Sequence, residues 1–329
     1  MNDSILCSIS TRNRYDTTLP MALLSVINQT KTPNKIIIFD DNEEPRDLRN
    51  FSHYNHLFQL MDIKKIEWEV IFGAKKGQSH NHQIANLKNY KWVWRLDDDN
   101  AAEPNVLETL FSYINEDVGA VGGSTPTPPL LFEDYTVSGK IDKIYNEPNL
   151  QWKLNIYKVQ EVDHLHCSYL YRAGVQDFNL GLSRLCHREE TLHTYGLKQK
   201  GYKILVVPNC VTWHLKNSEG GIRSESDENK NQEDFQHDER IFRNIINLKE
   251  HNIVVLNNGL GDHIVFKKVL KDIENPILFT CYPEIIPGKS IAEARFMFGD
   301  IEPYNVYRKM AEWGWEDSLE NAFRRLYLK

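Results

Sequence analysis

Residues 35–42 read KIIIFDDN, and this run indicates the fold class of the chain. Lys35–Phe39 is almost entirely apolar and β-branched, a composition typical of a strand that is buried on both faces of a sheet. The run ends abruptly at Asp40 and Asp41. Because strands covered on both faces occur in parallel sheets with helical crossovers, this stretch predicts an α/β fold.

The sequence around this stretch repeats the same alternation of strand and helix signals. A short apolar run, Ile5–Ser10, precedes it, and a second strand signal follows at Ile66–Phe72. A helical pattern then leads to a further strand signal at Trp92–Leu96. Repeated strand–helix–strand units predict a mostly parallel, twisted sheet with helices on both faces.

The overall composition is that of an ordinary globular protein. Of the 329 residues, 41% are hydrophobic and 26% are charged, which excludes wholesale disorder. The net charge of -7 disfavours a non-specific nucleic-acid-binding protein, which should be basic. The five cysteines are far apart and include no CxxC pair, so we expect neither a disulfide framework nor a cysteine zinc site, and a reducing, cytoplasmic location fits best. We also expect no signal peptide and no membrane-spanning segment.

The polarity along the chain predicts three parts. The strand and helix units described above belong to a first domain over residues 1–215. Residues 216–240 hold eight acids, four bases and a single aliphatic residue, Ile222, so we interpret 216–249 as a polar, acidic loop or linker. A fresh strand–loop–helix pattern begins at Ile253 and predicts a small α/β domain over residues 250–329.

Two clusters of acidic residues follow strands of the predicted sheet. Asp40 and Asp41 end one strand, and Asp97, Asp98 and Asp99 end another. In open α/β sheets, ligands bind outside the carboxyl ends of the strands. Closely spaced carboxylates suit Mg²⁺ or Mn²⁺, which also bind substrate phosphates. The alternative is that these acids cap the next helix or lie in solvent.

Two further candidates lie later in the sequence. His214 follows a predicted strand that ends near Val211, and an imidazole among carboxylates would favour Mn²⁺, although a packed or surface histidine is the simpler interpretation. Glu189 and Glu190 start a helical pattern, where they complement the helix dipole. A carboxylate beside a bound diphosphate would also have a raised pKa and could act as a general base.

In their order and spacing, these motifs resemble the family 2 glycosyltransferases, which have the GT-A fold. The resemblance covers about residues 4–215 and implies a nucleotide-sugar donor and a divalent cation, Mn²⁺ or Mg²⁺. The matching motifs are Ser10–Arg14, Leu23–Val26, Ile36–Asn42, Trp94–Asp99, Glu189–Leu192 and Gly201–Ile204.

The resemblance also implies a role for individual residues. Glu190 would take the position of the catalytic base, Asp99 that of the direct metal ligand, and His214 that of a further ligand. Asp97 would contribute to the metal site and lie near the ribose. The residues implied to bind the nucleotide sugar are Thr11, Arg12, Asn13, Arg14, Asp40 or Asp41, Asp97 and Asp98.

The implied activity is metal-dependent, inverting transfer of a sugar from a UDP-, GDP- or dTDP-sugar to an acceptor hydroxyl, with a saccharide or glycan as the default acceptor. The alternatives are a nucleotidyltransferase, a glycosyltransferase acting on a modified nucleic-acid base, and a non-catalytic module that binds nucleotide sugars. A nucleotidyltransferase usually needs a glycine-rich phosphate loop near the N-terminus, and Thr11–Arg14 contains no glycine.

The last two parts of the chain carry weaker expectations. The segment 216–240 is either a linker or a lid over the donor, with Gly220-Gly221 as its hinge and Arg223 reaching the diphosphate. Residues 253–270 resemble the start of heptosyltransferase-like GT-B domains, but the remaining 80 or so residues are too few for a complete GT-B enzyme. We therefore expect an accessory domain for acceptor binding or oligomerisation.

Overall fold

The two acid-ended strands of the sequence lie in one sheet, and the rest of the larger part of the molecule is built around it. The structure, a computed structural model, describes residues 4–73, 75–127, 135–136, 139, 141–144, 147–150, 153–154, 157–215, 220–222, 228–248, 251–298 and 305–328. The chain divides into two compact units, one of residues 1–144 and 149–239 and one of residues 145–148 and 240–329.

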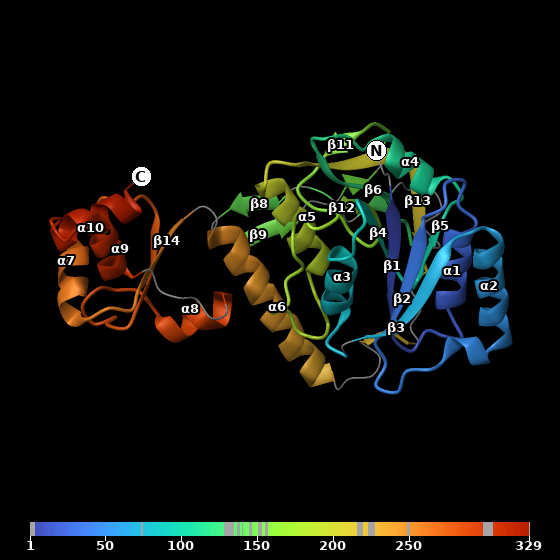
Figure 1. Ribbon diagram of the computed structural model, residues 1–329, viewed down its shortest axis with the longest axis horizontal. Helices are drawn as coiled ribbons and strands as arrows, with labels where there is room; N and C mark the ends of the chain where they lie inside the picture. The colour runs from blue at the N-terminus through green and yellow to red at the C-terminus, as the bar shows by residue number, and fades with distance from the viewer. Residues whose placement is uncertain are drawn as a thin grey trace. The chain divides into compact units, whose positions relative to one another are not determined.

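The larger unit contains a mixed sheet in which most of the paired residues lie in parallel ladders (Figure 1). Four of its strands run parallel in the order β4-β1-β2-β3: β1 Ile5–Thr11, β2 Lys35–Asp40, β3 Glu67–Phe72 and β4 Trp92–Asp97. The sheet continues beyond β4 through β12 Tyr169–Arg172, β6 Val118–Ser124, β13 Lys203–His214 and β11 Gln160–Glu161, with β5 Asn100–Ala102 paired to β13. This confirms the predicted α/β class and mostly parallel sheet.

Helices cover both faces of this sheet, and the residues of the strands alternate between the two cores. In Figure 1, α1 Leu19–Ile27 and α2 Ser52–Ile63 lie on one side, and α3 Gln78–Asn86 and α5 Glu189–Gln199 lie on the other. Ile36 and Ile38 belong to the first core, whereas Ile37 and Phe39 belong to the second. The unbroken apolar run of β2 is explained by this double burial.

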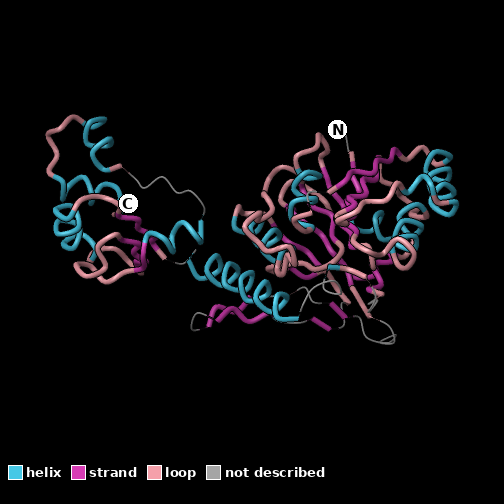
Figure 2. Tube along the Cα trace, turned by 90° about the horizontal axis from the view of Figure 1, so that it is seen from below, coloured by secondary structure: helices cyan, strands magenta, loops and turns pink. Residues whose placement is uncertain are grey.

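The other elements of the larger unit are short. In Figure 2, the strands of the main sheet of this unit, in magenta, lie between helices, in cyan. The shorter elements connect or extend these strands and helices. They are η1 Leu48–Asn50, α4 Val106–Ser112, β7 Tyr135–Thr136, β8 Ile141–Ile144 and β10 Lys153–Leu154. The strand β9 Glu147–Leu150 has residues in both units. The β7 and β10 strands form one two-stranded pair, and β8 and β9 form another.

The smaller unit has a parallel three-stranded sheet and its own hydrophobic core. Its sheet has the order β14-β15-β16, and the core includes Val254, Phe266 and Phe323. This part of the chain contains both strands and helices. Its elements are β14 Asn252–Leu256, α7 Leu260–Leu270, β15 Pro276–Thr280, β16 Lys289–Ser290, α8 Ile291–Phe298, α9 Val306–Trp313 and α10 Leu319–Tyr327.

Two local expectations differ from the structure. The segment expected as a solvated loop contains a helix, α6 Glu228–Leu248, because the polar window 216–240 stops just before Ile241, Phe242 and Ile246, which are buried. His214 does not follow a strand but is the last residue of β13. None of the described helices combines the length and apolar character needed to cross a membrane.

Candidate active site

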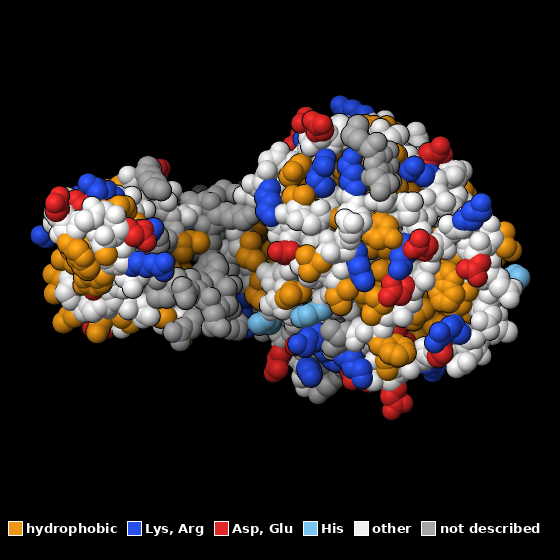
Figure 3. Space-filling model, in the orientation of Figure 1, with side chains coloured by type: hydrophobic (Ala, Val, Ile, Leu, Met, Phe, Trp, Pro, Cys, Tyr) orange, Lys and Arg blue, Asp and Glu red, His pale blue; other side chains and the backbone are white. Residues whose placement is uncertain are grey.

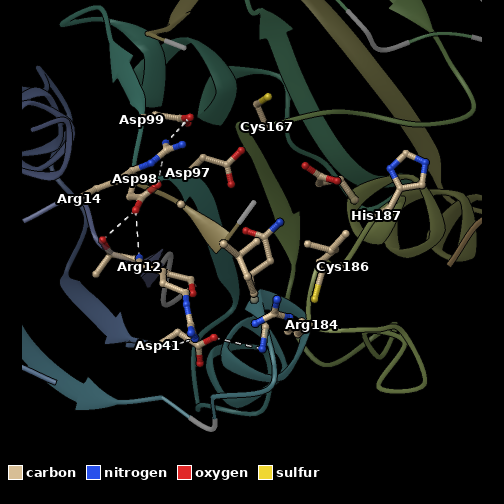
Figure 4. Close-up of a pocket in the computed structure, with 18 of the residues that line it drawn as sticks. Arg12, Arg14, Asp41, Asp97, Asp98, Asp99, Cys167, Arg184, Cys186 and His187 are labelled. Atoms are coloured by element: carbon tan, nitrogen blue, oxygen red, sulfur yellow. Dashed lines mark hydrogen bonds and ion pairs between the residues drawn. The ribbon is translucent and has the colours of Figure 1, made fainter. Parts of the chain in front are cut away.

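A cavity of about 520 Å³ lies at the carboxyl ends of the parallel strands, where an α/β sheet binds ligands. Its wall receives side chains from the ends of β1, β4 and β13 and from the first turns of α3 and α5. The residues predicted from the sequence that line it are Thr11, Arg12, Arg14, Asp41, Asp97, Asp98, Asp99, Glu190 and His214. Figure 4 shows how several of them lie around it.

Hydrogen bonds to Asp98 connect the loop after β1 to the residues that follow β4. Its carboxylate accepts hydrogen bonds from the Thr11 hydroxyl at 2.8 Å, the Arg12 backbone N–H at 3.3 Å and Arg14 Nη1 at 3.2 Å. Burial raises the pKa of Asp98 to about 7, against the opposing charge of Arg14. The contacts explain why an acid sits here: it satisfies loop donors that would otherwise be buried without partners.

Asp99 is held by an arginine and a histidine at the same oxygen atom. Arg14 Nη1 contacts Asp99 Oδ2, and His214 Nε2 lies 3.4 Å from it. Burial would raise the pKa of Asp99, but the hydrogen bond and charge of His214, together with Arg14, hold it well below its ordinary value. Asp99 is therefore ionised and paired. Arg14, which the resemblance implies to bind the nucleotide sugar, lies here against Asp98 and Asp99.

A buried arginine joins the two acidic ends of the site. Arg95 in β4 is fully buried, and its Nη1 lies 2.9 Å from Asp97 Oδ1. Its Nη2 lies 2.8 Å from Glu189 Oε2 and 3.2 Å from Glu190 Oε1. Of the two glutamates, only Glu190 lines the cavity, and Glu189 lies behind it. The first turn of α5 is thus anchored to the acid-bearing strand.

The two glutamates ionise differently because their partners differ. Burial raises the pKa of Glu189 to about 8, even with Arg95 beside it. For Glu190, burial is outweighed by the charges of Arg95 and His166, which lower its pKa to about 2. Glu190 is therefore a carboxylate at neutral pH, and it is the glutamate with access to the cavity.

Asp41 and its neighbour Asp40 have separate structural roles. Asp41 lines the cavity and accepts hydrogen bonds from the backbone of Lys75 at 2.9 Å and Gly77 at 3.1 Å. Asp40 does not line the cavity; its carboxylate accepts from Tyr15 at 2.5 Å and from the backbone of Arg46 at 3.0 Å. Of the two acids, only Asp41 is placed to contact a ligand.

Gly220 and Gly221, from the segment 216–240, form part of the wall of the cavity. The Gly221 N–H donates to the Arg12 carbonyl at 2.8 Å. Gly220 has φ +78°, and a Cβ there would lie 2.2 Å from the Asn13 carbonyl oxygen, so no larger residue fits. Asn13 itself does not line the cavity, and its N–H donates to Asn42 Oδ1. Arg223 lies outside the described residues.

The sequence reading missed one wall of the cavity. This wall comes from the segment before α5 and from the turn after His164, and His166 Nδ1 lies 3.6 Å from Glu190 Oε1. A His-Leu-His-Cys pattern at 164–167 was the available signal. The lining residues without a predicted role are His166, Cys167, Arg184, Leu185, Cys186, His187 and Arg188 on this wall, and Gly77, Gln78 and Thr191 at the starts of α3 and α5.

Comparison with known proteins identifies the family of the chain. The family model described as "Glycosyl transferase family 2" matches residues 7–174, about half of the chain, and includes the loop after β1 and Asp97–Asp99 at the end of β4. The chain belongs to glycosyl transferase family 2. The expected family membership and GT-A fold are thereby confirmed.

The other comparisons add less. The family 2 chain is similar to the solved structure titled "Crystal structure of GalNAc-T7 with UDP, GalNAc and Mn2+", with a TM-score of 0.49 and 14% sequence identity. The alignment covers 65% of this chain and 43% of that one, so the family 2 chain spans less than half of it. No match was found among curated proteins.

The donor atoms of the family 2 chain fit a divalent cation in part. Within the described residues, no three His, Cys, Asp or Glu side chains converge as a cation cage. Asp99 Oδ2 and His214 Nε2 do face each other at 3.4 Å, whereas Asp97 turns toward Arg95. Two protein ligands suffice for Mg²⁺ or Mn²⁺ when waters and substrate phosphates complete the shell.

Proposed function

We propose that this glycosyltransferase is an inverting, metal-dependent enzyme that transfers a sugar from a nucleotide-sugar donor to a hydroxyl of a saccharide acceptor. The observation that carries the proposal is that Asp41, Asp99 and Glu190 line a single cavity. These three residues come from different strand and helix ends, and only the fold brings them together.

In this proposal Glu190 is the general base. It is ionised at neutral pH and lines the cavity, so it can accept the proton of an acceptor hydroxyl as that oxygen attacks the anomeric carbon. A bound diphosphate would add negative charge nearby and raise the pKa of Glu190 toward the working range. Attack opposite the leaving diphosphate inverts the anomeric carbon.

Asp99 and His214 would hold the cation, which when bound would act as a Lewis acid on the leaving diphosphate. Asp41, at the end of β2, would contact the nucleoside end of the donor. Arg12 and Thr11 support that end, because Arg12 donates to the Asp41 carbonyl at 2.7 Å and Thr11 fixes Asp98. Holding donor and acceptor in line then supplies much of the rate.

The acceptor class follows from charge. The net charge of -7 disfavours a polyanionic acceptor, and on the face in Figure 3 the Lys and Arg side chains of the larger unit are interspersed with Asp and Glu. A neutral saccharide therefore fits better than a nucleic acid.

The test begins with a thermal-shift screen of UDP-, GDP-, CDP- and dTDP-sugars with and without Mn²⁺. A ligand that binds only the folded state raises the melting temperature. The correct donor should therefore raise the melting temperature, and it should raise it further when Mn²⁺ is present. Incubation of that donor with a panel of saccharides, followed by NMR of the product's anomeric carbon, then tests transfer and inversion.

Two variants test the assigned roles. We expect Glu190→Gln to lower kcat by about 10²–10⁴-fold without changing the donor-induced thermal shift. We expect Asp99→Asn to abolish the metal-dependent part of that shift. Glu116→Gln, at an exposed position, is the matched control. Near wild-type turnover by Glu190→Gln at saturating donor and acceptor would show that the assignment is wrong.

A further inference from the structure

The feature that carries a further inference is the position of the Arg14 guanidinium. It lies within the acid cluster of β4, with Nη1 3.2 Å from Asp98 Oδ1 and in contact with Asp99 Oδ2 (Figure 4). The side chain is 12% exposed, and the two acids are 11% and 10% exposed. A largely buried cation thus pairs with two largely buried carboxylates.

Charge balance explains why an arginine is needed at this place. Asp97 has its own partner in Arg95, which leaves Asp98 and Asp99 to be neutralised by other groups. Two buried carboxylates without a counter-ion would be strongly destabilising. Arginine stays charged at all relevant pH values, so its guanidinium can serve as a permanent counter-ion.

The contact with Asp99 is made at the oxygen that also faces His214. Arg14 Nη1 and His214 Nε2 both approach Asp99 Oδ2. A cation bound between Asp99 and His214 would need a lone pair of that same oxygen and would stand beside a guanidinium of like charge. The cation and the Arg14 side chain cannot both keep their best contact with Asp99.

We propose that Arg14 is the resident counter-ion of the acid cluster in the ligand-free protein and that it competes with the divalent cation for Asp99. The inference rests on the proposed function only in taking Asp99 as the metal ligand. Entry of the cation displaces the guanidinium from Asp99, and the freed positive charge then faces the cavity in which the donor diphosphate binds.

The neighbouring backbone shows that the position of Arg14 is built into the fold. The Gly220-Gly221 turn lies directly against its side chain: a Cβ on Gly220 would lie 2.8 Å from Arg14 Cγ, and one on Gly221 would lie 2.8 Å from Arg14 Nη2. Both glycines have positive φ, so the turn depends on them. A side chain at either glycine would therefore collide with Arg14 in this position.

The experiment measures Mn²⁺ binding to the full chain without nucleotide, using the EPR signal of free Mn²⁺. We expect Arg14→Met to bind Mn²⁺ about tenfold more tightly or better than wild type, because a competing like charge is removed. Arg14→Lys, which keeps the charge, should stay near wild type, as should the control Arg49→Met at an exposed ion pair. Unchanged or weaker binding by Arg14→Met overturns the proposal.

A second measurement needs no metal. In EDTA, Arg14→Met should unfold at a lower urea concentration than wild type, and the same substitution in an Asp99→Asn background should have a clearly smaller effect. Equal effects in the two backgrounds contradict the counter-ion role. If wild type transferred no sugar, the proposed function would be wrong, but the measured coupling between Arg14 and Asp99 would be unaffected. Failure of the proposed function and failure of the counter-ion proposal are therefore distinguishable.

Discussion

At the scale of single residues, Arg95 is a buried positive charge surrounded by acidic side chains of the site. Its fully buried guanidinium contacts Asp97, Glu189 and Glu190 and donates to the Cys167 carbonyl at 2.5 Å. Burial opposes its charge, but the surrounding carboxylates raise its pKa well above the ordinary value. Arg95 therefore fixes the distance between the acids of β4 and the proposed base.

We predict that Arg95→Met destabilises the protein by about 3–5 kcal/mol, the usual cost of removing one partner of a buried ionic network. The acids left behind must protonate or stay unpaired, so the loss should be greater at pH 8 than at pH 5. Urea unfolding, monitored by circular dichroism at both pH values, measures this loss of stability. Arg49→Met, at an exposed position, should show no measurable change, and an equal midpoint for the two variants would contradict the prediction.

Individual acids of the site were predictable because each follows a recognisable strand or starts a helix. Asp41, Asp99 and Glu190 have such positions, and all three line the cavity. Arg95 was not assigned a role, although a charge within the apolar strand WVWRLD was a visible signal. His166 gave little signal, because it lies in a turn whose approach to Glu190 depends on long-range packing.

At the scale of elements, α6 supports the segment that leads into the proposed base. Asp238 is fully buried and accepts from the Ser183 N–H at 2.6 Å, the Ser183 hydroxyl at 2.9 Å and the His187 N–H at 2.8 Å. Glu239 Oε2 lies 3.2 Å from His187 Nε2 and 3.0 Å from Arg188 Nε. The first half of α6 thus holds the cavity wall immediately before Glu189.

We predict that Asp238→Ala destabilises the protein by about 2–4 kcal/mol, because three buried donors lose their acceptor. We also expect lower kcat for sugar transfer, since the freed segment carries His187 and Arg188 and leads directly to Glu190. Urea unfolding and initial rates at saturating donor measure the two effects. Glu233→Ala, an exposed position on the same helix, is the control, and indistinguishable unfolding midpoints would refute the prediction.

The elements themselves were predictable to different degrees. Strands β1 to β4 and their helices follow from local apolar patterns, because each pattern is contiguous in sequence. The antiparallel insertion of β12 between β4 and β6 was not foreseen, since strand order depends on contacts between distant segments. The helix α6 was missed because its polar first half was read without the apolar residues Ile241, Phe242 and Ile246 that complete its pattern.

At the scale of the whole molecule, the pH dependence of stability reflects buried histidines. His164 and His193 lie inside the larger unit, and burial lowers their pKa values to about 4 and about 3. His193 Nε2 is 3.1 Å from the Gln176 carbonyl, and Nδ1 is 3.3 Å from the Tyr169 hydroxyl, which suits the neutral ring with its proton on Nε2. Phe178 stacks on this ring at 3.9 Å between centroids.

The sign of the pH effect follows from these lowered values. Above about pH 6.5 the two histidines are neutral in both folded and unfolded chains and cost nothing. As the pH falls below 6.5, the unfolded chain takes up protons that the folded chain does not, so stability declines until the folded values near 4 and 3 are reached. At that point each histidine has lowered the free energy of unfolding by an amount on the order of 3 kcal/mol.

We therefore predict that His164 and His193 lower the free energy of unfolding of the larger unit between pH 6.5 and 4, a contribution that the raised pKa values of Asp98 and Glu189 oppose, so it is isolated by comparing wild type with a histidine variant. In His193→Gln, the amide can still donate to the Gln176 carbonyl but does not titrate. Its stability should be lower than wild type at pH 7.5 because the stacking with Phe178 is lost, and it should fall less steeply toward pH 4. Urea unfolding at half-unit pH intervals measures both slopes, and parallel curves for the two proteins would show that His193 does not control the acid side of the profile.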